Sequence, residues 1–274
     1  MTLLDGKKVS NEIIENIKEK ISMENIKLGF AIIWVGNDEA SSIYVKNKIK
    51  KCEYVGINTE LFHLEENTTE NQLIELIEKL NNRDEINGIL LQSPVPKHIN
   101  ITNCFNAIDS RKDIDGFSNV SVGNLYLGKP FHVSCTPKGI IKLLDYYNIN
   151  LEGKNVCLIN RSNIVGKPLF HLLIDKNATV TMCHSKTNNL EKFTKEADIV
   201  ISAVGKPKFI TSKMIKDDAI VIDVGISRVE GKVVGDVDYE EVSKKTSFIT
   251  PVPGGIGPMT IAMVLENILN TGKE

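Results

Sequence analysis

Residues 155–168, NVCLINRSNIVGKP, decide the fold predicted for this chain. The apolar run 156–159 predicts a short buried strand, and Val165 opens an apolar helical pattern after a polar turn. α/β proteins bind phosphates at such a loop, because free backbone N–H groups and the positive end of the helix dipole point toward it. The Gly-x-Gly-x-x-Gly pattern is absent, so this loop alone is a weak sign of a dinucleotide site.

The second strand of the same unit ends in CHSKT at 183–187, which contains no carboxylate. NAD sites place an acidic residue near this point to bind the ribose, whereas the 2′-phosphate of NADP requires positive or hydroxyl groups. Arg161 can offer a forked donor to that phosphate, with Ser185 nearby. The alternative is that both are ordinary loop residues. Taken together, the two loops favour a cofactor site, and NADP over NAD.

Strands alternate with helices along the rest of the chain. Strands are predicted at 155–159, 179–183, 198–203 and 219–224, with helices between them, which is typical of a doubly wound parallel sheet. Upstream, strands at 30–35, 59–64 and 88–92 alternate with amphipathic helices, one of them at 39–54. The predicted fold class is therefore α/β: two α/β domains flanking a cleft, the second a Rossmann-like doubly wound parallel sheet.

A domain boundary is predicted near Phe117, because residues 121–130 are rich in glycine and turn formers. The predicted limits are 1–118, 119–255 and a C-terminal helix at 256–274. A last helix follows the run TPVPGGIGPMT at 250–260, whose glycines would let a ligand approach the backbone closely; a plain loop is the alternative.

Charge and cysteine usage exclude several classes of protein. The formal net charge of −2 gives no reason to expect nucleic acid or an anionic membrane as partner. The five cysteines are scattered without a Cys-x-x-Cys pair, and charged residues stand where a signal peptide needs an apolar core, so reduced thiols and a cytoplasmic location are expected. No apolar run approaches the roughly 20 residues that span a bilayer. The histidines show no zinc spacing, and no metal is expected.

Few side chains stand out as candidates for chemistry. Tyr44 and Lys48 lie one helical turn apart, although a helical lysine is usually only solvated. Gln92 follows a buried strand, where open α/β sheets place ligand groups, but it could equally face water. Asp113 and Asp115 form either an acid/base pair or a turn.

Eight stretches, in order over nearly the whole chain, together resemble the bifunctional methylenetetrahydrofolate dehydrogenase/cyclohydrolase family. They are ASSIYVKNKIKKCEYVGI from Ala40, GILLQSPVPKHI from Gly88, KDIDGF from Lys112, SCTPKGII from Ser134, NRSNIVGKP from Asn160, ATVTMCHSKT from Ala178, DVGISR from Asp223 and TPVPGGIGPMT from Thr250. The resemblance implies NADP-dependent oxidation of 5,10-methylenetetrahydrofolate, then hydrolysis of the methenyl product to 10-formyltetrahydrofolate, in the one-carbon metabolism that serves purine, methionine and histidine biosynthesis.

The resemblance also implies roles for particular residues, a homodimer, and a final helix that returns to pack on the first domain. It makes the first domain the folate-binding one and the second the NADP-binding one. Lys48 is implied as catalytic, with Tyr44 and Gln92 as its neighbours. The residues implied for the folate are Asp115, Tyr44, Pro251, Val252, Gly254 and Gly255, and those for the cofactor are Asn160, Arg161, Ser162, Ser185 and Ile226.

Hydrolysis of a cationic methenyl carbon needs a base for the attacking water. We expect neutral Lys48 to be that base, because partial burial and a cationic substrate disfavour its ammonium form. Asn160 replaces the family's usual glycine; asparagine tolerates a left-handed backbone, but its side chain could crowd the cofactor. Ser93 likewise replaces the usual leucine of Leu-Pro-x-Pro. The alternatives are a dehydrogenase without cyclohydrolase activity and a non-catalytic folate- or nucleotide-binding protein.

Overall fold

The computed structural model describes residues 1–271, which form two compact units. The six-stranded unit comprises Met1–Asn11 and Thr136–Thr260, and the three-stranded unit comprises Glu12–Cys135 and the chain from Ile261 onward. The α/β class and the two-domain organisation are confirmed. The functional limits at residues 118 and 255 stay a prediction.

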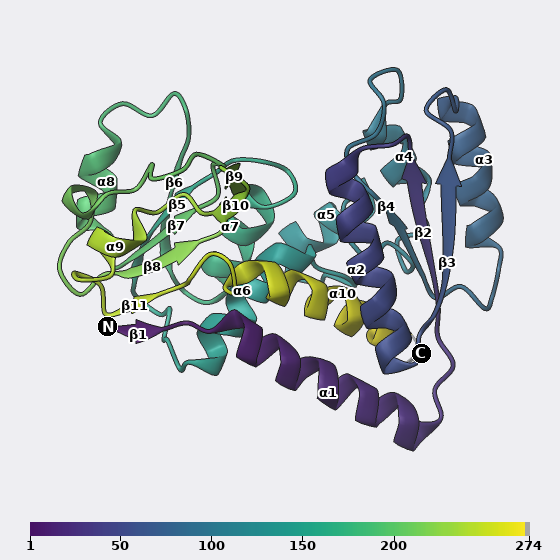
Figure 1. The fold of residues 1–274 in the computed structure, drawn as a ribbon, viewed down its shortest axis with the longest axis horizontal. Coiled ribbons are helices and arrows are strands. Elements are labelled where there is room, and N and C mark those ends of the chain that lie inside the picture. Colours follow the sequence, from purple (N-terminus) through teal and green to yellow (C-terminus); the bar gives the residue numbers. More distant parts are fainter. Residues whose placement is uncertain (272–274) are drawn as a thin grey trace. The chain divides into compact units, whose positions relative to one another are not determined.

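The parallel sheet predicted for the second half is present in the six-stranded unit (Figure 1). All of its paired strands run parallel, in the order β1-β11-β8-β7-β5-β6. β1 and β11 were not predicted from sequence, because strands of two residues show no periodicity. The strands are β1 (Thr2–Leu3), β5 (Asn155–Ile159), β6 (Thr179–Cys183), β7 (Ile199–Ser202), β8 (Ile220–Asp223) and β11 (Phe248–Ile249).

The order of strands in this sheet reverses at β5, which pairs with β6 on one side and with β7 on the other. Open α/β sheets bind ligands at the carboxyl ends of the strands on either side of such a reversal. A separate antiparallel hairpin, β9 (Ser227–Val229) and β10 (Lys232–Val234), turns at Glu230 and Gly231 as expected. The remaining helices of this unit are α6 (Cys135–Tyr146), α7 (Gly166–Asp175), α8 (Leu190–Glu196), η1 (Ser212–Met214) and α9 (Tyr239–Val242).

The three-stranded unit contains a parallel sheet in the order β3-β2-β4, with α2 and α3 on opposite faces (Figure 1). Every residue of β2 except one is buried, as its continuous apolar run predicts, because both faces are covered. The predicted capping box of α3 is present, with Gln72 N–H donating to Thr69 Oγ1 over 3.3 Å. The elements are β2 (Gly29–Val35), α2 (Glu39–Val55), β3 (Asn58–Leu64), α3 (Glu70–Asn81), β4 (Gly88–Leu91) and α4 (Ile101–Ala107).

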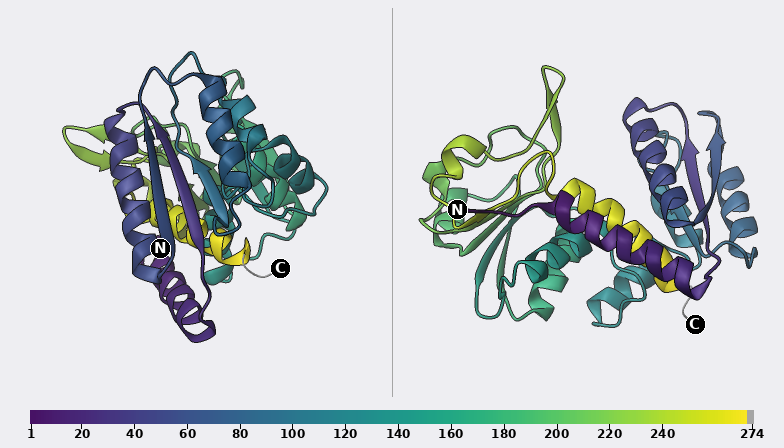
Figure 2. Two further views of the ribbon diagram at one scale, coloured as in Figure 1. Left: turned by 90° about the vertical axis from the view of Figure 1, so that its right-hand side faces the viewer. Right: turned by 60° about the horizontal axis from the view of Figure 1, so that its bottom comes forward.

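Two helices from the ends of the chain complete one side of this core. The apolar faces of α1 (Gly6–Glu24) and α10 (Ile256–Thr271) share a cluster with Phe30 and Ile32 of β2. Figure 2 shows these helices side by side. Asn267 of α10 donates its amide to Ile114 O over 2.8 Å and to Val133 O over 3.0 Å, so this helix is also joined to the unit by buried polar contacts.

Residues 121–130 are rich in glycine and turn formers, but the first half of this stretch is helical. α5 (Asn119–Tyr126) is a helix, because Ser118 caps it by accepting a hydrogen bond from Ser121 N–H over 3.2 Å. Gly128, with φ of +69°, follows its end. Gly123 lies inside the helix, although its residue type favours a turn.

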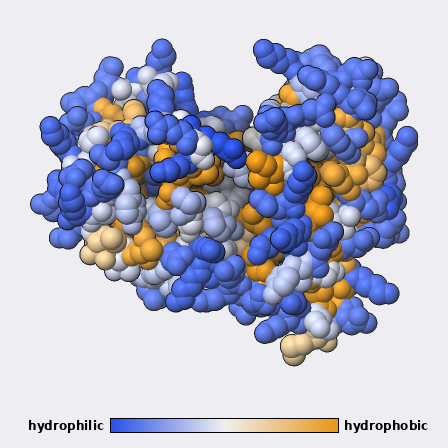
Figure 3. Space-filling model, in the orientation of Figure 1, coloured by the Kyte–Doolittle hydropathy of each residue, from blue (hydrophilic) through white to orange (hydrophobic). Residues whose placement is uncertain are grey.

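Hydrophilic side chains cover most of the surface visible in Figure 3. Within residues 1–271 no helix is both long and apolar enough to cross a membrane.

Candidate functional site

Lys48 and Gln92 meet in the three-stranded unit. Lys48 lies on α2, which covers one face of the sheet, and Gln92 follows β4 directly. Lys48 Nζ donates to Gln92 Oε1 over 3.0 Å, and Gln92 Nε2 donates to Ser93 O over 2.7 Å. Gln92 is only 9% exposed, so its amide is held in one orientation with its oxygen toward the lysine. The structure thus brings together two of the residues singled out from the sequence.

The two aspartates that follow have different surroundings. Asp113 is buried and accepts hydrogen bonds from the N–H groups of Phe117 and Ser118 and from the hydroxyl of Ser121. It therefore stabilises the turn, which is one of the two alternatives predicted for it. Burial raises the pKa of Asp115, and nearby Lys48 opposes that rise. Asp115 therefore interacts electrostatically with the lysine.

Tyr44 lies one turn before Lys48 on α2, with 43% of its surface exposed. Its ring is thus available to a ligand, whereas Val45 beside it is buried in the core. Residues 93–96 follow β4, and the peptide bond between Ser93 and Pro94 is cis. Ser93 contributes its backbone carbonyl to the Gln92 amide, a contact that does not depend on its side chain.

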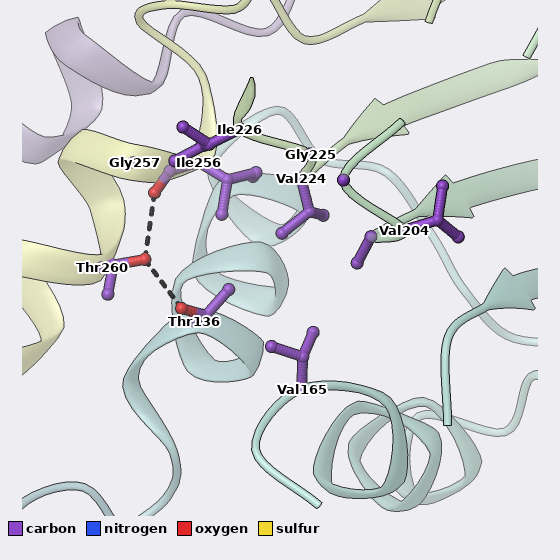
Figure 4. A pocket seen from close by; sticks show the side chains of 11 residues that line it. Thr136, Val165, Val204, Val224, Gly225, Ile226, Ile256, Gly257 and Thr260 are labelled. Carbon is purple, nitrogen blue, oxygen red and sulfur yellow. Dashed lines mark hydrogen bonds between the residues drawn. The ribbon is translucent and has the colours of Figure 1, made fainter. Parts of the chain in front are cut away.

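The six-stranded unit holds a cavity of about 370 Å³ at the carboxyl ends of its central strands (Figure 4). Ala203 and Val204 follow β7, Val224 and Gly225 follow β8, and Val165 precedes α7. Ile226, implied as a cofactor contact, is 48% exposed and lines the same cavity. The remaining wall comes from Thr136 on α6 and from Ile256, Gly257 and Thr260 on α10.

Asn160 is folded into the loop and does not adopt a left-handed backbone. Asn160 is not one of the residues with a positive φ, so the tolerance of asparagine for a left-handed backbone plays no part here. The Oδ1 atom accepts from Ser162 N–H over 2.7 Å and Gly166 N–H over 3.0 Å, and Nδ2 donates to Ala203 O over 2.5 Å. Gly166 is required here, because a Cβ at that position would collide with Asn160.

The N–H groups at the start of α7 are not free, contrary to the prediction for residues 155–168. Val165 N–H donates to Ser162 Oγ over 3.1 Å, and Lys167 N–H donates to Ser162 O over 3.0 Å. Together with Gly166, three successive N–H groups are bonded within the loop. Phosphate binding here must therefore rest more on side chains than the helix-terminus argument predicts.

Arg161 and Ser185 emerge at the same edge of the sheet. Ile159 of β5 and Cys183 of β6 are register partners, and each candidate lies two residues beyond its strand's partner residue. Both side chains are exposed. The predicted pairing of these loops around one phosphate is compatible with that register.

The glycine-rich loop before α10 is held by the start of α1. Lys7 N–H donates to Gly254 O over 2.8 Å, and Gly6 lies so close to Gly255 O that a Cβ would collide with it. Gly254 has a φ of +107°, which explains the glycine at that position. Pro251 and Val252 precede it, and the bond from Val252 to Pro253 is cis.

Asp223 and Asp236 were missed by reasoning from the sequence. Both are buried next to the cavity loops, and both accept several hydrogen bonds. Each faces a glycine of the other's segment, Gly235 and Gly225, where a Cβ would collide with the carboxylate. In the sequence, Asp223 stands two residues before Gly225, and Asp236 directly follows Gly235. Such spacings of aspartate and glycine are too common to identify a functional residue. Within residues 1–271, no group of three acidic, cysteine or histidine side chains could hold a metal ion.

The parallel sheet with its cavity at the strand ends, and the separate α/β unit with a partly buried lysine–amide pair, define an α/β enzyme of the nucleotide-binding dehydrogenase class. Two family models match: the tetrahydrofolate dehydrogenase/cyclohydrolase catalytic domain over residues 4–115, and the NAD(P)-binding domain of the same name over 134–274. The chain belongs to the tetrahydrofolate dehydrogenase/cyclohydrolase family.

Similar proteins cover the full chain. The "Bifunctional protein FolD" of Agathobacter rectalis is 52% identical over 276 residues, 99% of each chain. A crystal structure of the bifunctional FolD methylenetetrahydrofolate dehydrogenase/cyclohydrolase from Campylobacter jejuni has a TM-score of 0.98 at 50% identity, covering 100% of this chain and 99% of the other. FolD from Trypanosoma brucei, complexed with NADP cofactor and an inhibitor, has a TM-score of 0.93 at 33% identity, covering 98% and 96%.

Proposed function

We propose that this protein oxidises 5,10-methylenetetrahydrofolate with NADP and hydrolyses the methenyl product to 10-formyltetrahydrofolate. The membership of a bifunctional family over the full chain supports both reactions. The observation that carries the hydrolytic half is the bond between Lys48 Nζ and Gln92 Oε1. A dehydrogenase without hydrolysis, or a protein that only binds, would not require that pair.

Lys48 is proposed as the base of the hydrolytic step. Water adds to the cationic methenyl carbon and must lose a proton, which a neutral Nζ can accept through a lone pair. Gln92 accepts a hydrogen bond from Nζ and so orients that lone pair away from itself, toward the substrate side. We propose that Tyr44, exposed on the same helix, contacts the folate ring system, and that Asp115 binds the pterin.

The acidic group at Asp115 suits a pterin. Burial raises its pKa, and the charge of nearby Lys48 opposes that rise. We propose that Pro251, Val252, Gly254 and Gly255 supply further folate contacts, because their backbone lies open to close approach at Gly254.

The residues around the cavity fit NADP. The cavity in the six-stranded unit is lined by small and apolar groups, as a flat cofactor ring requires, and Ile226 projects there with half its surface exposed. Bound there, the cofactor would supply a hydride acceptor for the folate. Arg161, Ser162 and Ser185 are proposed to bind the phosphates, and Asn160 to shape the loop that carries them.

Replacing Lys48 tests the hydrolytic assignment. Lys48→Met keeps much of the side chain's volume and removes the basic atom, so hydrolysis of methenyltetrahydrofolate is expected to fall by about 10²- to 10⁴-fold. The KM for NADP should stay close to that of the wild type. Lys46→Met is the matched control, because Lys46 is exposed on the same helix. Undiminished hydrolysis by Lys48→Met would refute the role of this lysine.

The assembly and the location are further parts of the proposal. A homodimer is proposed from the family resemblance, and light scattering at several protein concentrations measures the mass directly. A cytoplasmic location is proposed from the cysteines, which are all free and buried. The products would serve purine, methionine and histidine biosynthesis.

A further inference from the structure

Asp236 ties the loop after β7 to the loop after β10. Its Oδ2 accepts from Ser202 Oγ over 2.8 Å and from Val204 N–H over 2.7 Å, and its Oδ1 accepts from Lys206 N–H over 2.8 Å. Asp236 is fully buried, and so is Ser202. A single carboxylate thereby sets the backbone on both sides of Gly205, and Val204 and Gly205 line the cavity (Figure 4 labels Val204).

Asp223 does the same for the loop after β8. Its Oδ1 accepts from Gly225 N–H over 3.0 Å and from Asp236 N–H over 2.9 Å, and its Oδ2 accepts from Val237 N–H over 2.9 Å. The side chain is 4% exposed. Gly225, whose position this bond sets, lines the cavity together with its neighbours Val224 and Ile226.

The two carboxylates form one interlocked cluster. Asp223 accepts from the backbone of Asp236, and Gly225 and Gly235 leave room for the carboxylates where any side chain would collide. Every donor in these six bonds is a neutral N–H or O–H group. Burial, with a contribution from the charge of Asp236, raises the pKa of Asp223 to about 6. The cluster thus places two acidic groups in the interior. Its bonds to the N–H groups of Val204 and Gly225 hold two residues of the cavity wall.

We infer that Asp223 and Asp236 are positioning residues for the cofactor. They hold the strand-end loops that contain Val204, Gly205, Gly225 and Ile226 in the shape that receives NADP before it arrives. This inference rests on the proposed function, since it assigns the cavity to that cofactor. A preformed pocket spends no binding energy on ordering its loops, so loss of the cluster should weaken cofactor binding more than it slows the reaction of the bound complex.

Asp236→Asn is the first test. An amide has one oxygen, so either Val204 N–H or Lys206 N–H must then face an NH₂ group and lose its acceptor. We expect the KM for NADP to rise about tenfold or more while kcat at saturating NADP changes less than about threefold. Cyclohydrolase activity on methenyltetrahydrofolate supplied directly should stay unchanged, because its proposed base belongs to the other unit. Asp238→Asn is the matched control, because its carboxylate makes a 3.2 Å salt bridge to the exposed Lys208.

A milder variant covers the case in which Asp236→Asn does not fold. Ser202→Ala removes one of the three donors to Asp236 and should raise the KM for NADP about threefold. An unchanged KM in folded Asp236→Asn, or in Ser202→Ala where the first does not fold, overturns the inference. A parallel fall of kcat and of cyclohydrolase activity also overturns it, since that pattern marks general destabilisation.

Titration calorimetry with NADP separates this inference from the proposed reaction. If the wild type binds NADP but forms no NADPH, the proposed oxidation fails. Weaker binding by Asp236→Asn would then still support the positioning role. If the wild type does not bind NADP, both fail together.

Discussion

Asn160 joins the ends of two neighbouring strands through one amide group. Its three hydrogen bonds link the residue after β5 to the start of α7 and to Ala203 after β7. Val165 and Ala203, on either side of this link, both line the cavity. The side chain forms hydrogen bonds within the protein and joins the two loops.

Removal of the hydrogen bonds made by the Asn160 side chain should lower the affinity for the cofactor. Asn160→Ala loses all three bonds, and we expect the KM for NADP to rise about five- to tenfold, because the loops must be ordered on binding. Asn163→Ala in the same exposed loop serves as the control. Steady-state kinetics with NADP varied at saturating folate measures the effect. A KM equal to that of the wild type would show that these hydrogen bonds have no bearing on the cofactor.

The ends of helices show which local features a sequence encodes well. A glycine after a helical pattern predicts a helix end, and Gly56 ends α2 at φ of +90°, with its N–H donating to the last turn. The pattern Thr69-Glu70-Asn71-Gln72 likewise predicts the capping box of α3. Both signals involve residue types with one strong local preference. α5 was missed because Gly123 lies inside it, although its cap at Ser118 carries the usual signal.

Two glycine substitutions should change the free energy of unfolding in opposite directions. Gly56→Ala places a Cβ on a left-handed backbone and should lower the free energy of unfolding by about 1 kcal/mol. Gly123→Ala lies inside α5 with no atom near the added methyl group, and should raise it by about 0.5–1 kcal/mol. Urea unfolding of both variants beside the wild type checks the signs. Equal shifts in the same direction would contradict the assignment of the two backbone conformations.

At the scale of the whole molecule, the sequence predicted the classes of element and the parallel sheets well. Long apolar runs such as that of β2 report burial on two faces directly. The pairing of Lys48 with Gln92 followed only from the family resemblance, because they are 44 residues apart and no periodicity connects them. Asp223 and Asp236 could not be found, since all but one of the six donors are backbone N–H groups, which leave no trace in residue types.

Acid should weaken the three-stranded unit through Glu60. The Arg83 guanidinium lowers the pKa of Glu60 below its usual 4.5, so this carboxylate stabilises the fold at higher pH and loses that contribution as the pH falls below about 4.5. Both side chains are one third exposed, so solvent screening limits the effect to about 0.5–1 kcal/mol. Glu60→Gln should show a shallower fall in unfolding free energy between pH 6 and 3.5, which are roughly the limits of that titration.

Glu75→Gln, exposed on α3, is the control for this pH series. An identical pH dependence of Glu60→Gln and the wild type would mean that the ion pair with Arg83 contributes nothing to stability.

Asp223, in the six-stranded unit, has the opposite effect on the pH dependence of stability. Its pKa is raised to about 6, so its contribution favours the fold at low pH and is lost as the pH rises through that value.

The central claim is that one chain performs both reactions. The most direct measurement mixes the wild-type protein with 5,10-methylenetetrahydrofolate and either NADP or NAD, and follows reduced cofactor by absorbance and 10-formyltetrahydrofolate by chromatography. We expect NADPH and the formyl product in equal amounts at completion, with a slower reaction when NAD replaces NADP. NADPH without formyl product would contradict the bifunctional claim, and no NADPH at all would contradict the dehydrogenase.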